Sequence, residues 1–379
     1  MNKQNSLITR YCLAVVAIVA LLGPLAQNGR GDFVLWYDEQ ITVNSHHNQG
    51  ILYDTSRAFI VSGGSVHNLY AYNYSDVNIS GGSVDYLYPY DSSTVNFSSG
   101  SITKPLYAYD SSTVNFSGGN VNGGLSACDS STVNFSGGYV SGLYSSGSSV
   151  VDFSGGSVDY LQASISSVVD ISGGSVSNIE AYDSSTANIS GGSVSNLKAY
   201  NSSTIIFHGR GFRASGSLVL DGERVLGTGI LSGEWMDGTR WVVSIITNEP
   251  TATILAIPVY ILTIDVDPND VGIDTITPSV GAHDYGGWVN INAQQFTKCP
   301  DVYVFDHWEG DVNDPNSANT TVFMDTDKTV TAVFVDGRKC GDECHPYPIG
   351  DLDKDCEVTF GDFALFASHW LECTKPECD

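Results

Sequence analysis

The chain has 379 residues and carries 16 Lys and Arg against 42 Asp and Glu, a formal charge of −26. This acidity argues against nucleic acid or an anionic membrane as a partner, because both attract clustered basic residues. With 42% hydrophobic and 11% aromatic residues, the composition also excludes a charge-rich disordered chain. The length exceeds that of one ordinary domain, so we expect several folded domains.

Residues 1–26 have the pattern of a secretory signal peptide. Lys3 and Arg10 precede an apolar run that a Gly-Pro pair ends. The run falls short of the ~20 residues that a membrane span needs, which disfavours an anchor. We therefore predict cleavage after Ala26, export to an extracellular or cell-surface location, and no transmembrane segment after signal removal.

A repeat of 18 or 19 residues dominates the segment that we assign as residues 27–212. Its Ser-Gly-Gly unit, or a variant of it, begins at Ser62, Ser80, Ser98, Ser117, Ser136, Ser154, Ser172 and Ser190. Each repeat alternates apolar and polar residues, as in residues 94–97, and has Gly-Gly and Asp-Ser-Ser turn signals without helical periodicity. Short strands at a fixed period predict a parallel β-solenoid of about nine coils, of either handedness.

Equivalent residues of successive coils should stack into ladders. One ladder contains Tyr72, Tyr90, Tyr109, Tyr182 and Tyr200, with Cys128 as an exception that we expect to be a lone buried thiol. A second has the pattern Thr-x-Asn and is interrupted by Val150/Asp152 and Val168/Asp170.

The first interpretation of these ladders is that they stabilise the solenoid. The second is that the five tyrosines bind sugar rings, since Tyr offers an apolar face beside polar donors, which makes a polysaccharide or cell-envelope glycan a candidate partner. A flat Thr-x-Asn array could also match an ice lattice, but the two interruptions argue against that.

Most acidic residues of the repeat recur at equivalent turn positions, as do Asp91, Asp110, Asp129 and Asp183. A catalytic residue would instead break the repeat, and the acids that do so are Asp152, Asp159, Asp170 and Glu180. Residues 62–207 contain two lysines, Lys104 and Lys198, and no arginine. We therefore predict no catalytic residues. The alternative is a polysaccharide lyase or glycoside hydrolase that acts on an acidic face of the solenoid.

Residues 213–260 lose the period and read as strands around Asp-Gly turns. An open solenoid end exposes unpaired backbone, so we predict that this segment is a C-terminal β cap. Trp235 and Trp241 should form its core.

Residues 261–336 are rich in short strands. The box Val304–Asp311, with the sequence VFDHWEGD, and the closing strand Met324–Phe334 resemble the divergent internalin-type B-repeat of bacterial secreted proteins. The resemblance implies a small β-grasp-like spacer or adhesion module without catalysis, in which His307 and Trp308 are structural.

The tail, residues 337–379, contains a twelve-residue loop with oxygen ligands at EF-hand spacing. Side chains at positions 1, 3, 5, 9 and 12 are those of Asp351, Asp353, Asp355, Thr359 and Asp362, and Glu357 at position 7 would bind through its carbonyl. Apolar spacing after the loop predicts a helix. Carboxylates this close repel one another unless a cation lies between them, so the loop predicts calcium binding.

The loop resembles the calcium-binding half of a type I dockerin, with Asp at position 12. It departs from that family in two ways, because Cys356 replaces the glycine usual at position 6 and only one loop is present. The resemblance implies calcium as a cofactor and a cohesin-like protein as a candidate partner for the tail.

Cysteines concentrate near the C-terminus. The disulfide candidates are Cys299, Cys340, Cys344, Cys356, Cys373 and Cys378, for which fifteen connectivities exist. Zinc bound through Cys340, Cys344 and His345 is a weaker interpretation, because paired ligand spacing is missing.

The sequence thus predicts an all-β protein with a short EF-hand-like loop–helix tail. We expect a secreted or cell-surface, non-catalytic structural or adhesive protein, with carbohydrate binding as a candidate activity and a tail that tethers or docks it.

Overall fold

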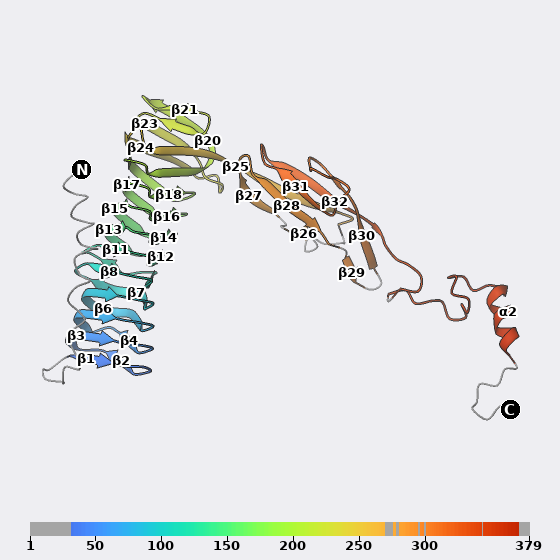
Figure 1. Ribbon diagram of the computed structural model, residues 1–379, viewed down its shortest axis with the longest axis horizontal. Coiled ribbons are helices and arrows are strands. Elements are labelled where there is room, and N and C mark those ends of the chain that lie inside the picture. The colour runs from blue at the N-terminus through green and yellow to red at the C-terminus, as the bar shows by residue number, and fades with distance from the viewer. Residues whose placement is uncertain are drawn as a thin grey trace. The chain divides into compact units, whose positions relative to one another are not determined.

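The computed structural model describes residues 32–269, 276–277, 280–294, 296–298, 301–342 and 344–370. The chain divides into two compact units, Met1–Pro258 and Val259–Asp379, shown in Figure 1. Each unit is described by itself below. Within the described ranges, no helix is both long and apolar enough to cross a membrane.

The first unit is a parallel β-solenoid of about ten coils, which confirms the predicted fold. Its strands form two ladders. The first ladder contains β1 (Phe33–Leu35), β3 (His46–Leu52), β5 (Ser65–Ala71), the end of β6 (Asp76–Pro89), β8 (Leu106–Ala108), β10 (Asn120–Val121), β11 (Leu125–Ala127), β13 (Tyr139–Ser145), β15 (Ser157–Ala163), β17 (Ser175–Ala181) and β19 (Ser193–Ala199). The second contains β2 (Gln40–Val43), β4 (Arg57–Ile60), the start of β6, the start of β7 (Thr94–Ile102), β9 (Thr113–Phe116), β12 (Thr132–Phe135), β14 (Val150–Phe153), β16 (Val168–Ile171), β18 (Thr186–Ile189) and the start of β20 (Thr204–Gly216). The end of β7 pairs with β10 in the first ladder.

Alternation along the strands determines what lies inside. In β5 the apolar residues Val66, Leu69 and Ala71 are buried, and the start of β6 buries Val77 and Ile79 in the same core. Stacked phenylalanines fill the second ladder, with neighbouring ring centroids 4.7–4.9 Å apart. The rings belong to Phe97, Phe116, Phe135 and Phe153. Like residues therefore stack inside the solenoid because each coil repeats the register of the last.

The β-turns that follow the first ladder require a left-handed backbone. Asp91, Asp110 and Asp129 have φ between 54° and 56°, a region that Asp tolerates better than most residues. The Asp91 amide donates to Asp110 Oδ2 in the next coil at 3.2 Å. These recurring acids are turn residues, as predicted. The Gly-Gly turns leave no room for a side chain, because a Cβ on Gly174 would lie 2.7 Å from the Phe153 ring.

Additional strands cover the last coil. After β20 come β21 (Val219–Asp221), β22 (Arg224–Leu226), β23 (Gly229–Glu234), β24 (Arg240–Asn248) and β25 (Thr253–Asp267). Strand β24 pairs with β19 and β25 pairs with β20, both in parallel, so both ladders are continued. Trp235 and Trp241 are buried and stack on each other, and Trp241 stacks on Phe207. The prediction that both tryptophans form the cap core is confirmed.

The second unit begins with an all-β module. One sheet contains the second half of β25, β27 (Val280–Asp284), β29 (Phe296–Lys298), β30 (Asp301–Glu309) and β32 (Lys328–Asp336). The other contains β26 (Ile276–Thr277), β28 (Trp288–Ala293) and β31 (Asn319–Phe323). Trp308 is buried in the shared core, which confirms its structural role. Helix α2 (Phe360–His369) follows in the tail.

Candidate functional site

The tail brings together the side chains predicted for loop positions 1, 3 and 12. Carboxylate oxygens of Asp351, Asp353 and Asp362 all lie within 4.8 Å of one another. Asp351 and Asp362 are only 8% and 3% exposed, whereas Asp353 faces solvent. The loop thus holds two sheltered carboxylates and one accessible carboxylate around a common point.

Backbone amides orient the two buried carboxylates. Asp351 accepts hydrogen bonds from the amides of Asp355 at 3.2 Å and Cys356 at 2.9 Å. Asp362 accepts from the amides of Leu352 at 2.6 Å and Thr359 at 2.7 Å. Because Asp362 accepts hydrogen bonds from residues at both ends of the loop, it holds the two ends together.

The same residues start helix α2. Thr359 is its N-cap and accepts from the Gly361 amide at 3.0 Å, and Asp362 completes a capping box by bonding the Thr359 amide. The helix fixes positions 9 and 12 of the loop. Asp355 and Glu357 are exposed, and Asp355 accepts from the Glu357 amide at 2.9 Å. These two predicted ligands lie in the loop but outside the three-carboxylate group.

Acidic residues outnumber basic ones in this loop by five to one, and the one lysine, Lys354, lies over the Tyr347 ring. Partial desolvation raises the pKa of Asp353, and repulsion from Asp355, Asp362 and Asp351 raises it further. By contrast, the hydrogen bond from the Thr359 amide lowers the pKa of Asp362. Within the described residues, no Lys, Arg or His forms an ion pair with these carboxylates. An all-oxygen donor set of this charge fits a hard cation such as calcium.

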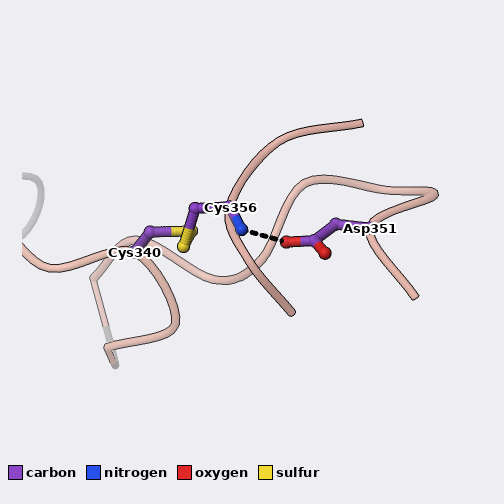
Figure 2. Close-up of side chains that lie close together, drawn as sticks. All are labelled: Cys340, Asp351 and Cys356. Atoms are coloured by element: carbon purple, nitrogen blue, oxygen red, sulfur yellow. Dashed lines mark hydrogen bonds between the residues drawn. A yellow bond between two sulfur atoms is a disulfide. The ribbon is translucent and has the colours of Figure 1, made fainter. Parts of the chain in front are cut away.

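A disulfide bond joins the loop to the segment before it. Cys340 and Cys356 are bonded, with their Cα atoms 5.8 Å apart, and Figure 2 shows the bond beside Asp351. Cys344 is disulfide-bonded as well. Bonded cysteines cannot bind zinc as thiolates, so the zinc interpretation is wrong. The other candidates, Cys299, Cys373 and Cys378, lie outside the described residues.

Cys128 also differs from expectation. It is buried directly after β11, where Tyr would continue the column, and it is disulfide-bonded rather than a lone thiol. That prediction was wrong.

The predicted tyrosine ladder exists as a column of stacked rings. Tyr72, Tyr90 and Tyr109 lie nearly parallel, with neighbouring centroids 5.0 Å apart. Tyr182 and Tyr200 form a separate stacked pair at 4.6 Å. The sequence analysis missed two extensions: Trp36 and Tyr53 continue the column toward the N-terminus, and a second column beside it contains Tyr70, Tyr88 and Tyr107. The signal was a Tyr two residues before Tyr72, Tyr90 and Tyr109, on the same face of the strand.

Stacking determines what these rings offer to a ligand. Each inner ring of the column covers the faces of its neighbours, and the Tyr90 hydroxyl is itself buried, so little more than ring edges can meet a ligand. Burial raises the pKa of Tyr88 to about 12 and the pKa values of Tyr72 and Tyr90 further. The arrangement favours stabilisation by ring–ring contact over face-on stacking of a sugar.

The acidic residues that break the repeat do not form one cluster. Asp152 and Asp170 face each other in β14 and β16 of the second ladder. Asp159 and Glu180 belong to β15 and β17 of the first ladder. The four residues therefore lie on two different faces of the solenoid and do not form one acidic face.

Glu180 instead belongs to a network that the sequence analysis missed. It accepts hydrogen bonds from Tyr160 at 2.7 Å, Tyr182 at 2.5 Å and Lys198 at 2.8 Å. Its side chain is 12% exposed. Burial acts to raise the pKa of Glu180, but the three donors outweigh it and the pKa is lowered. A carboxylate held by three donors is a poor proton acceptor, so the network is structural in character.

The fold defines the class of this protein as a β-solenoid repeat protein joined to a small β module and a loop–helix tail. Residues 264–338 match the family model of the divergent InlB B-repeat domain, as the box and closing strand predicted. The match covers the β module of the second unit. No curated protein and no solved structure matches the chain.

Proposed function

We propose that this chain is an exported, non-catalytic structural or adhesive protein of the cell surface, in which the solenoid is a rigid spacer and the tail is a calcium-dependent attachment element. The observation that carries the proposal is the coil-to-coil pairing of the outer side chains. Asn96, Asn115 and Asn134 hydrogen-bond one another along the solenoid at 2.8 Å. Side chains that satisfy one another in this way favour stability over catalysis.

The B-repeat module supports the same function. A repeat-type domain beside a solenoid is typical of proteins that display or space other modules rather than catalyse reactions. Export and surface location rest on the pattern of residues 1–26 and on the association of the B-repeat family with surface proteins.

Calcium binding by the tail rests on the donor set. Asp351, Asp353 and Asp362 would supply carboxylate oxygens, and Asp355, Thr359 and the Glu357 carbonyl would complete the site. The ion would neutralise the repulsion that raises the pKa of Asp353.

The face of α2 supports a docking role for the tail. Leu352, Leu365, Phe366, His369 and Trp370 line a hollow of about 600 Å³. Phe363 and Trp370 are 64% and 66% exposed, although both side chains are large and apolar. Contiguous apolar surface of this kind marks protein interaction sites, so a cohesin-like protein is the proposed partner.

Calorimetric titration of the full chain with calcium tests the attachment element. We expect one bound ion per chain and at least about tenfold weaker binding by Asp351→Asn. The matched control is Glu357→Gln, which removes one charge from the same loop but keeps the backbone carbonyl, and it should bind almost as tightly as the wild type. Absence of binding by the wild type would overturn the calcium proposal.

A panel of soluble and insoluble polysaccharides tests the solenoid. Retention of the protein without released sugars would support glycan binding as the adhesive activity, and absence of both would leave the spacer role. Released products would support the alternative, a polysaccharide lyase or glycoside hydrolase. In that case Glu180→Gln and Asp170→Asn would show which ladder is responsible, since the two residues lie on different faces.

A further inference from the structure

Position 6 of the calcium loop has an unusual occupant. Cys356 has φ of 77°, in the left-handed region that glycine adopts freely and other residues rarely adopt. A loop of this kind needs that conformation to turn its backbone amides inward. Something outside the local backbone preference must therefore hold Cys356 in place.

The disulfide bond supplies that restraint. Cys356 is bonded to Cys340, sixteen residues earlier in the chain. Cys340 lies in a turn that folds around Asp342, which accepts the amides of Lys339 at 2.8 Å and His345 at 2.6 Å. Position 6 is thus tied to a turn with its own hydrogen bonds.

The restraint reaches the metal site through one hydrogen bond. The Cys356 amide donates to Asp351 Oδ2 at 2.9 Å, as Figure 2 shows. Asp351 is the position 1 ligand of the loop and is buried. A carboxylate oxygen has more than one lone pair, so it can accept this amide and still bind a cation. If Cys356 left the left-handed conformation, Asp351 would lose the donor that orients it.

We propose that the Cys340–Cys356 disulfide positions Asp351 and thereby makes the calcium affinity of the tail depend on oxidation. The inference rests on the proposed function, in which this loop binds calcium. A thiol reductant would transfer two electrons and two protons to the S–S bond, giving two cysteine thiols, and would itself become a disulfide. The tail would then bind calcium tightly in an oxidising environment and weakly in a reducing one.

Three forms of the full chain test this inference by calorimetric titration with calcium chloride. They are the wild type, Cys340→Ser, and the double variant Cys340→Ser/Cys356→Gly, which restores the residue suited to the left-handed backbone. Each is measured with and without dithiothreitol. Disulfide mapping by mass spectrometry verifies that Cys356 is unpaired in the single variant, and circular dichroism verifies that the β domains remain folded.

We expect about tenfold weaker calcium binding by Cys340→Ser, from the strain of a left-handed non-glycine residue. The reduced wild type should weaken by a similar factor. The double variant should recover most of the calcium affinity. Dithiothreitol also opens the disulfide of Cys344, but the affinity of the double variant should not change, because it lacks the Cys340–Cys356 bond.

The outcomes separate this inference from the calcium proposal. Tight binding by both the wild type and Cys340→Ser would overturn the role of the disulfide and leave the calcium site intact. A double variant as weak as the single variant would overturn the backbone mechanism, and one that loses affinity in dithiothreitol would assign the effect to other disulfides. Absence of binding in every form would overturn the calcium proposal and this inference with it.

Discussion

Lys198 and Glu180 form an ion pair across adjacent coils of the solenoid, with Lys198 Nζ 2.8 Å from Glu180 Oε1. The two residues occupy the same outward position of β19 and β17, where the two preceding coils carry Gln162 and Tyr144. Tyr160 and Tyr182 complete the bonding of Glu180. An ion pair therefore takes the place that the second tyrosine column has in earlier coils, beside the stacked pair Tyr182 and Tyr200.

Removing the lysine should destabilise the solenoid. Lys198→Met leaves the Glu180 carboxylate sheltered with one fewer donor, so we expect a loss of about 1–3 kcal/mol in the free energy of unfolding. The matched control is Lys104→Met, since Lys104 is an exposed lysine of the same repeat and its removal should change little. Guanidinium unfolding followed by circular dichroism measures both. Equal effects of the two substitutions would contradict a special role for the pair.

Glu180 should also contribute to the acid sensitivity of the fold. Its pKa in the folded protein is lowered from 4.5, so its stabilising effect is present above that value and is lost as the pH falls through the lower folded pKa. The difference in unfolding free energy between the wild type and Glu180→Gln should therefore shrink between about pH 5 and pH 2. Unfolding curves across this range measure it, and a difference that stays constant would show that the carboxylate is not stabilised in the fold.

Ile165 is a site where a substitution should stabilise the protein. Its φ is 64°, although β-branched residues disfavour the left-handed region, and equivalent positions in neighbouring coils carry Asp129, Gly147, Asp183 and Asn201. Its side chain is 40% exposed, so little burial is lost on replacement. We expect Ile165→Asn to raise the free energy of unfolding by about 1 kcal/mol. Ile165→Val keeps the strain and should have little effect, and an equal gain from both would contradict this explanation.

The tyrosine column should matter more for stability than an isolated tyrosine. Tyr90 stacks on both Tyr72 and Tyr109, whereas Tyr74 is 70% exposed. We expect Tyr90→Ala to cost about 2–4 kcal/mol and Tyr74→Ala less than about 0.5 kcal/mol. Thermal unfolding ranks the two variants. If Tyr90→Ala abolished glycan retention without changing stability, the column would be a binding surface rather than a structural one.

The repeat made much of the solenoid predictable. Its fixed period placed Thr94 beside Thr113 and Asn96 beside Asn115, and the observed registers agree. Buried and exposed faces followed from alternation along the strand. Features that recur in every coil can be predicted, because each coil has the same environment as the coil before it.

Contacts between residues at different positions of the repeat could not be predicted from the period. Tyr160 reaches Glu180 diagonally over 20 residues, and Asp152 and Glu180 belong to opposite ladders although both break the pattern. The pairing of Cys340 with Cys356 could not be deduced, because cysteine spacing leaves the connectivities open until the backbone is placed. The loop carboxylates could be predicted because their spacing itself defines the coordination geometry.

The uniform register of the coils has a consequence for length. Since each coil contacts mainly the coils before and after it, removing or duplicating one whole repeat would leave every remaining ladder in register. The solenoid would then change length in steps of about 4.8 Å. A gene that gains or loses repeats by recombination would thus adjust the length of the solenoid without redesigning its core.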